Sequence, residues 1–210
     1  MIDKALVTDQ VIDVFDAAGI KKPDISILSD EFLMEVRDME HKNLALEVLR
    51  KLLNDEIKNR SKLNLVQSRS LMEMLEESIR KYHGKVLTAA QVMDELIDLG
   101  KEMRDMDKEA HDIGLTDYEY AFYTAIAQND SARELMGKTK LRELAVVIYQ
   151  KVKENATIDW TLKESVKAKL KVTVKRTLRK YGYPPDMQEL ATETVLEQAE
   201  MIAEELTGKE

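Results

Sequence analysis

Two rows of residues, one apolar and one basic, run side by side through the segment 159–181. Each row repeats every four residues. The apolar row comprises Leu162, Val166, Leu170, Val174 and Leu178, and the basic row comprises Lys163, Lys167, Lys171, Lys175 and Arg179. Because an α-helix turns every 3.6 residues, a row with a period of four winds around it. The pattern predicts a basic helix, with Asp159 as its N-cap and Gly182 at its end, that packs against at least two crossing helices.

A second amphipathic segment follows this helix after the turn at Pro184 and Pro185. Residues 186–210 carry eight acidic residues and one basic residue, Lys209. Their apolar residues recur at helical spacing and include Leu190, Val195, Leu196, Ala199, Ile202 and Ala203. Since a short turn between two helices favours antiparallel packing, the sequence predicts a C-terminal helical hairpin over residues 159–206.

The charges of this hairpin allow two interpretations. Between residues 163 and 180 eight basic residues stand against one acid, Glu164. In the first interpretation the acidic helix neutralises the basic one across the pair. In the second, a basic strip is exposed for phosphates or for an acidic partner. The candidate residues of this basic strip are Lys167, Lys171, Lys175, Arg176 and Arg179.

The sequence pattern of the rest of the chain also predicts a series of helices. Apolar spacing predicts helices over residues 4–18, 30–38, 41–59, 71–83, 89–113, 117–128 and 140–153, with a short turn over 131–136 and an extended connection over 21–30. The expected caps are Ser29 or Asp30, Ser70 with Glu73, Thr88 with Gln91, and Thr116. The basic link 60–69 either continues a helix or bends. We therefore predict an all-α fold of about eight to nine helices, in one compact domain over residues 1–210.

The helix over 89–113 has the most regular pattern. Its apolar residues alternate at spacings of three and four, as in Ala89, Val92, Leu96, Leu99, Met103, Met106, Ala110 and Ile113. Such a seam packs against a partner helix at about +20°, which belongs either to this chain or to another subunit. Because the flanking positions carry no consistent code of opposite charges, we favour a partner within this chain.

Composition limits the function further. The chain has a formal net charge of −8 and no cysteine, which excludes disulfides and thiolate metal sites. No apolar run is long enough for a membrane span or follows Met1 as a secretory signal, so we expect a cytoplasmic protein. Since non-specific DNA affinity comes from neutralising phosphates, an acidic protein contacts DNA only through a local strip.

Short motifs that resemble catalytic or nucleotide-binding sites occur in the sequence, but the residues or secondary structure that those sites require are missing. Gly137-Lys138-Thr139 resembles the end of a phosphate-binding loop, but Ala132 stands where that loop requires glycine. Glu56 and Lys58 have the spacing of a nuclease motif, yet on a helix these positions diverge. The three histidines, His41, His83 and His111, are far apart in the sequence. We therefore expect no catalytic, cofactor-binding or metal site in this chain.

Long blocks of the sequence resemble one protein family. The blocks are KKPDISILSDEFL (21–33), the segment 43–70, AAQVMDELIDLGKEMR (89–104), TIDWTLKESVKAKLKVTVKRTLRKYGYPPD (157–186) and ATETVLEQAE (191–200). In this fixed order they resemble the C-terminal helical domain of the R subunit, the motor and nuclease subunit, of bacterial type I restriction enzymes. The resemblance runs from about Val11 to Glu205.

The resemblance implies that this chain is the C-terminal fragment of a longer R subunit. The parent would be a type I site-specific deoxyribonuclease with ATP-dependent translocase activity, using ATP and Mg²⁺ through domains upstream. This region would then dock the motor onto the methyltransferase core of M and S subunits. The alternative is a helical domain that contacts translocating duplex DNA through its basic helix.

Overall fold

The computed structural model describes residues 29–155 and 164–207, and helices occupy most of them. The elements are α2 (Asp30–Asp38), α3 (Lys42–Ser61), α4 (Leu65–His83), α5 (Ala89–Asp112), α6 (Asp117–Ala127), α7 (Asp130–Asn155), α8 (Glu164–Lys180), the 3-10 turn η2 (Pro185–Met187) and α9 (Gln188–Thr207). No strand occurs within these two ranges, so the predicted all-α domain is confirmed. The predicted helix over 4–18, the connection up to residue 28 and the Asp159 cap lie outside the described residues.

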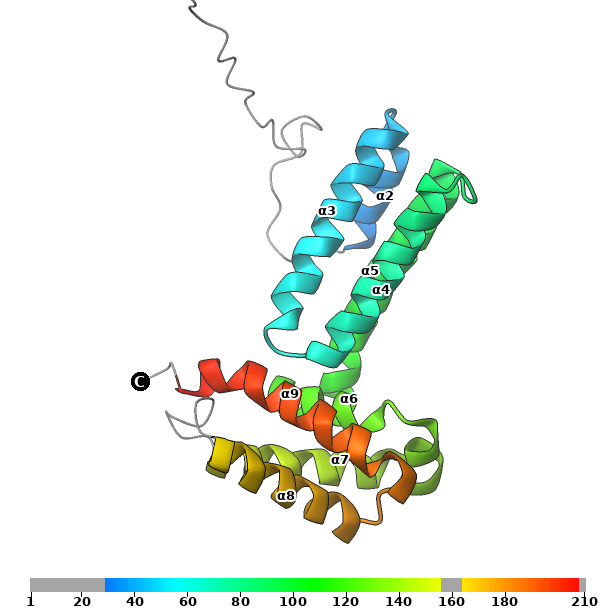
Figure 1. The fold of residues 1–210 in the computed structure, drawn as a ribbon. Coiled ribbons are helices and arrows are strands. Elements are labelled where there is room, and N and C mark those ends of the chain that lie inside the picture. The colour runs from blue at the N-terminus through cyan, green and yellow to red at the C-terminus, as the bar shows by residue number, and fades with distance from the viewer. Residues whose placement is uncertain (1–28, 156–163, 208–210) are drawn as a thin grey trace, which may run out of the picture.

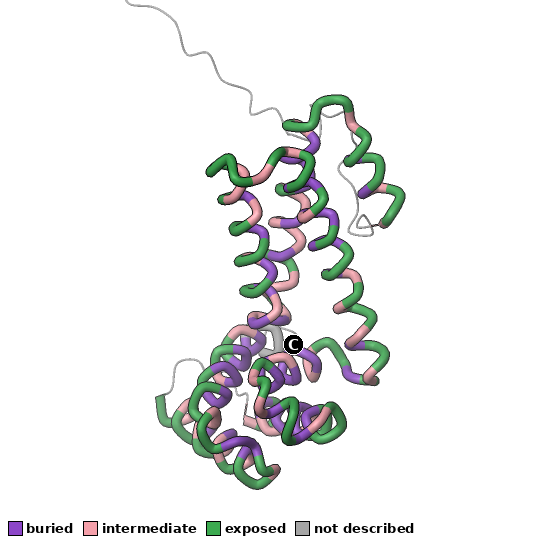
Figure 2. Tube along the Cα trace, turned by 90° about the vertical axis from the view of Figure 1, so that its right-hand side faces the viewer, coloured by how far each residue is buried: buried purple, intermediate pink, exposed green. Residues whose placement is uncertain are grey.

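The helices form two groups that cross each other (Figure 1). Helices α3, α4 and α5 run alongside one another with α2 against α3 and α5, while α6 to α9 cross below them. Each group buries a hydrophobic cluster, and the cluster of α6 to α9 also includes Val66 of α4 and Ala110 of α5. Figure 2 shows that buried residues lie on the helix faces that look toward neighbouring helices. The domain thus has two hydrophobic clusters, a division that no loop of unusual length or composition marks in the sequence.

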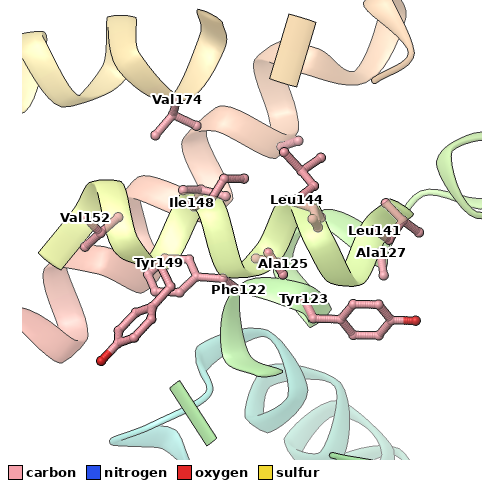
Figure 3. Close-up of a cluster of buried hydrophobic side chains, with 14 of the residues drawn as sticks. Phe122, Tyr123, Ala125, Ala127, Leu141, Leu144, Ile148, Tyr149, Val152 and Val174 are labelled. Atoms are coloured by element: carbon pink, nitrogen blue, oxygen red, sulfur yellow. The ribbon is translucent and has the colours of Figure 1, made fainter. Parts of the chain in front are cut away.

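The α6–α9 cluster is built around the aromatic residues of α6. Phe122 is fully buried, and its ring centroid lies 6.0 Å from that of Tyr149 on α7. Figure 3 shows these two rings beside Ile148, with Val174 of α8 above them. Tyr149 also stacks on Tyr118, with centroids 5.9 Å apart. The run of aromatics near residue 120 therefore packs the core.

Most helix starts follow their predicted caps. The Ser29 hydroxyl accepts from Phe32 N–H at 3.2 Å, and Thr88 with Gln91 forms the expected capping box. The start of α4 is the exception, because Asn64 caps it by accepting from Gln67 N–H at 3.0 Å. Ser70, predicted as the N-cap, lies inside α4 on an exposed position. The link between α3 and α4 therefore turns only at residues 62–64.

The seam of α5 packs within the chain, as we favoured. Val92, Leu96, Leu99 and Met103 are buried against α3 and α4. The buried surface of α5 is wider than the seam alone, because a second row is buried as well. This row comprises Met93, Ile97 and Gly100.

Two glycines with positive φ interrupt or end helices, and Gly182 does so where the sequence predicted. Gly137 has φ 70° and ψ 165°, which breaks α7 into two helical parts. Gly182 has φ 75°, and the following Tyr183 N–H donates to Leu178 O at 3.0 Å to close α8. The Tyr183 hydroxyl then donates to Ile126 O of α6 at 2.8 Å, which fixes the turn against the core. The predicted α8–α9 hairpin is confirmed.

A polar contact joins the two groups of helices. Gln198 of α9 is fully buried, and its Oε1 accepts from Leu65 N–H at 2.9 Å. Its Nε2 donates to Leu63 O at 2.6 Å. From α6, Thr124 Oγ1 donates to Asn64 Oδ1 at 3.0 Å. The turn between α3 and α4 is therefore held by both α6 and α9.

Candidate interaction surface on the C-terminal hairpin

The basic strip lies on α8, and α9 covers one part of it. Lys167 Nζ lies 2.8 Å from Glu200 Oε1. Lys171 Nζ lies 3.4 Å from Glu189 Oε1 and 3.9 Å from a carboxylate oxygen of Glu193. Glu189 also pairs with Lys175, the next lysine of the row. This sequence of pairs runs in opposite directions along the two helices, as an antiparallel hairpin requires.

These ion pairs favour the charged forms of their members. The hydrogen bond to Glu200 raises the pKa of Lys167 above its usual range. The hydrogen bonds from Lys175 and Lys171, with their charges, lower the pKa of Glu189 below its usual range, against a smaller opposing effect of burial. All of these groups stay in contact with solvent, so each pair contributes little to stability by itself. The main consequence of these ion pairs is that Lys167, Lys171 and Lys175 already have carboxylate partners within the hairpin.

The two arginines of the strip lie on another side of α8. Arg176 and Arg179 are exposed, and no ion pair joins either to another residue that the structure describes. Their spacing places them on one helix face with Lys169 and Val172. Val172 keeps 56% of its surface exposed. We call this the outer face of α8, and it comprises Lys169, Val172, Arg176, Arg179 and Lys180.

The predicted strip is therefore divided in two. Lys167, Lys171 and Lys175 fit the interpretation in which hairpin charges neutralise each other. Arg176 and Arg179 fit the interpretation of an exposed basic surface. The four-residue repeat could not separate Arg179 from the three lysines, because its row winds around the helix from one side to the other, and Arg176 lies outside that row.

The motifs with catalytic potential occupy helical positions. Gly137 lies between the two parts of α7 and Lys138 Nζ lies 3.9 Å from Glu109. Glu56 accepts a hydrogen bond from Arg60 Nε at 2.8 Å, whereas Lys58 is exposed. In the described part of the chain, no group of three His, Asp or Glu residues could hold a metal ion.

Arg60 is an interaction centre that the sequence analysis missed. Its two terminal nitrogens donate to Asp107 Oδ1 and Oδ2, each at 2.6 Å, and one also donates to Met103 O at 3.0 Å. Burial alone would lower the pKa of Arg60. The hydrogen bonds and charges of Asp107 and Glu56 outweigh this effect, so the pKa of Arg60 lies above its usual value. This arginine connects α3 to α5, and its two partners on α5, Met103 and Asp107, lie more than 40 positions away in sequence, beyond the reach of local patterns.

Surface grooves occur on both groups of helices. One lies between α3 and α4 and is lined by Arg50, Leu75, Ile79 and Arg80, among others. A second lies where α4, α5, α6 and α7 meet, and its wall includes the stacked rings of Tyr120 and Tyr123. Both grooves are open to solvent and mix apolar walls with charged rims. Among the helices that the structure describes, none has the length and apolar character needed to cross a membrane.

Comparison with known proteins identifies relatives along the whole chain. The family model described as "Type I restriction enzyme HindI endonuclease subunit-like, C-terminal" matches residues 1–205. The type I restriction enzyme HindI endonuclease subunit of Haemophilus influenzae is 39% identical over 208 residues, which cover 99% of this chain and 20% of that protein. A putative type I restriction enzyme MjaIXP endonuclease subunit of Methanocaldococcus jannaschii is 34% identical over 183 residues, covering 87% of this chain and 18% of that protein. The chain thus spans about a fifth of the length of these relatives. No solved structure gives a significant match.

Proposed function

Because this chain belongs to the family of type I restriction enzyme HindI endonuclease subunit-like C-terminal regions, we propose that it is a docking domain. In this proposal it is non-catalytic and joins the ATP-dependent translocase and nuclease of an R subunit to the methyltransferase core of M and S subunits. ATP and Mg²⁺ would serve the parent protein through domains outside these 210 residues. The relatives, which are about five times longer, are named as endonuclease subunits.

The distribution of charge on the hairpin carries this proposal. Three of the five cations in the basic strip, Lys167, Lys171 and Lys175, already bind carboxylates of α9. A chain of net charge −8 with a partly neutralised strip repels duplex DNA at long range. Protein surfaces of mixed charge impose no such repulsion. The charge pattern therefore favours a protein partner over DNA.

The second candidate function is contact with translocating duplex DNA. Its supporting observation is that Arg176 and Arg179 are exposed beside Lys169 and Lys180 on α8. If these four cations neutralise about four phosphates, the logarithm of the binding constant would fall with the logarithm of salt with a slope of about −4. Binding of this kind would be weak and lost near physiological salt.

Two titrations separate these functions. In the first, the purified chain is added to a purified M–S core in about 150 mM salt, and binding is followed by calorimetry. In the second, the chain is added to a labelled duplex of about 30 base pairs between about 50 and 200 mM salt. The docking function predicts saturable binding to the core and only weak, salt-sensitive binding to the duplex. Tight duplex binding that survives about 200 mM salt, without binding to the core, would reverse the assignment.

A further inference from the structure

We propose that residues 4–18 of this chain pack as an amphipathic helix into the groove between α3 and α4. The occupant of this groove is thus a segment of the same chain, connected to α2 by residues 19–28. This inference is independent of the docking function proposed above, because it concerns contacts within one chain.

The groove has an apolar floor along α4. Leu75 and Ile79 line it and are at most 9% exposed, and the partly buried Met72 lies three positions before Leu75. Figure 1 shows α3 and α4 side by side along this groove. A groove between two packed helices accepts a third helix, because side chains of the third helix fit between the ridges of the other two. The site therefore suits a helix with an apolar face.

The segment 4–18 has the sequence of such a helix. It lies outside the described residues, so its sequence is the evidence. Its apolar residues recur at spacings of four, three and four, as Val7, Val11, Val14 and Ala18. In a helix, Asp9, Asp13 and Asp16 lie on the side opposite this apolar seam. Since a seam of this period packs against neighbouring helices, the segment matches the groove in form and polarity.

Charge distinguishes this groove from its neighbour between α4 and α5. With His83 counted as neutral, its lining has three bases and two acids, a net charge of +1: Arg50, Lys51, Arg80, Glu47 and Glu76. The lining of the neighbouring groove has one base and four acids, a net charge of −3: Lys81, Glu77, Glu95, Asp98 and Glu102. Residues 1–20 contain four acids and one lysine, a net charge of −3. The α3–α4 groove therefore attracts this segment, whereas the α4–α5 groove repels it.

The connection to α2 is long enough for the segment to reach the groove. Ser29 caps α2, which packs against α3 and α5. Residues 19–28 form a link of ten residues, which spans up to about 33 Å when extended. Since a helix with its side chains is about 10–12 Å across, the link can pass from α2 around α3 to its α4 side. Attachment to the same chain also raises the local concentration of the segment to about the millimolar range, so weak intrinsic binding fills the groove.

Disulfide trapping in the full chain tests the proposal, because the chain has no cysteine of its own. We would combine Met72→Cys on the groove floor with one change in the seam at a time: Val7→Cys, Val11→Cys or Val14→Cys. A disulfide requires Cα atoms within about 7 Å of each other. At least one of the three pairs should close within one chain at least about tenfold faster than the controls, because docking raises the local concentration of the two thiols. Concentrated urea should abolish this difference.

The matched controls change one partner of the pair. Met74→Cys replaces Met72→Cys in the first control, since Met74 is 39% exposed and lines the α4–α5 groove. The two positions are two residues apart, so an undocked segment would reach both at similar rates. The second control, Asp13→Cys with Met72→Cys, uses the polar side of the segment and should also react slowly. Circular dichroism and the melting temperature Tm verify folding, and Glu76→Cys on the exposed rim replaces Met72→Cys where that change lowers Tm.

Substitutions in the seam give a readout without cysteines. Val11→Asp with Val14→Asp should remove the segment from the groove and lower the Tm of the full chain by at least about 2 °C, since apolar contacts are lost. Ala5→Asp with Thr8→Asp adds the same charge to the segment at positions outside the seam. This control should change Tm by less than about 1 °C.

The possible results separate three arrangements. If the seam positions react with Met72→Cys no faster than with Met74→Cys, the segment does not occupy this groove and the proposal is wrong. If the fast disulfide joins two chains, as a dependence on protein concentration would show, the groove binds the segment of a second copy and docking within one chain is overturned. Fast closure that is independent of concentration supports the proposal, and an unchanged Tm of Val11→Asp with Val14→Asp would contradict it.

Discussion

Arg60 on α3 binds Asp107 on α5 through two parallel hydrogen bonds, each 2.6 Å long. The arginine side chain is only 15% exposed and also contacts Glu56, which is similarly buried. Replacing Arg60 with Leu should destabilise the domain by roughly 2–4 kcal/mol, because the change leaves the Glu56 carboxylate and the Met103 carbonyl without this donor. Urea denaturation at pH 7 measures the loss.

The partner of this pair supplies a graded control. Asp107 is 60% exposed, so Asp107→Asn should cost less than about 1 kcal/mol. Arg50→Leu on the same helix removes an exposed arginine and should change stability by at most about 0.5 kcal/mol. A loss for Arg60→Leu as small as that for Arg50→Leu would show that the buried hydrogen bonds contribute little.

Gln198 holds the turn between α3 and α4 against α9. Replacing it with Leu would leave the Leu65 N–H and the Leu63 carbonyl without their buried partner. We expect a loss of roughly 2–3 kcal/mol in the free energy of unfolding, since each unsatisfied buried group costs about 1–3 kcal/mol. Hydrogen exchange should also show faster exchange at the Leu65 amide than in the wild type.

The neighbouring residue Glu197 provides the comparison for Gln198. It forms an ion pair with Arg69 at 2.7 Å, but both side chains are about half exposed. Glu197→Gln should therefore change stability by less than about 0.5 kcal/mol and leave the Leu65 amide protected. Equal effects of the two substitutions would contradict a specific role for Gln198 at the junction.

Local patterns predicted most of the fold but not how its helices are assembled. The caps at Ser29, Thr88 and Thr116 were predicted because a cap and its donor are only three positions apart. The α4 start was wrong because the Ser70–Glu73 spacing also arises by chance inside a helix, and only the structure shows that Asn64 caps it. The division into two hydrophobic clusters depends on contacts between distant residues, such as Gln198 with Leu63.

The basic strip on α8 was predicted only in part, because its exposure also depends on contacts between helices that are distant in sequence. Sequence spacing identified a basic helix beside an acidic one, and both are present. It did not indicate which cations point toward α9, since that depends on the rotation of α8 about its axis. The core contacts of Leu170, Val174 and Leu178 fix this rotation, so Arg176 and Arg179 face outward.

Gly137 has a backbone conformation that other residues rarely adopt. With φ 70° and ψ 165° it lies in a region used almost only by glycine. Gly137→Ala should destabilise the domain by roughly 1–3 kcal/mol through backbone strain, although space for a methyl group is present, as no atom lies within 4 Å of an added Cβ. Thermal unfolding measures the effect. The adjacent Lys138→Ala, at an 81% exposed side chain, should leave Tm nearly unchanged.

The ion pairs of Glu189 should make the hairpin sensitive to acid. Their lysine partners lower the pKa of Glu189 below the ordinary value of 4.5. A group whose pKa is lowered on folding stabilises the folded state above its unfolded pKa, and this contribution is lost as the pH falls through the folded pKa. Glu189→Gln should therefore lower Tm modestly at pH 7, and the difference from the wild type should disappear near pH 3. Glu143→Gln, at an exposed position of α7, should give no difference at either pH. A Tm difference for Glu189→Gln that is equally large at pH 3 and pH 7 would mean that its effect comes from packing or helix propensity, and that charge pairing does not hold α8 to α9.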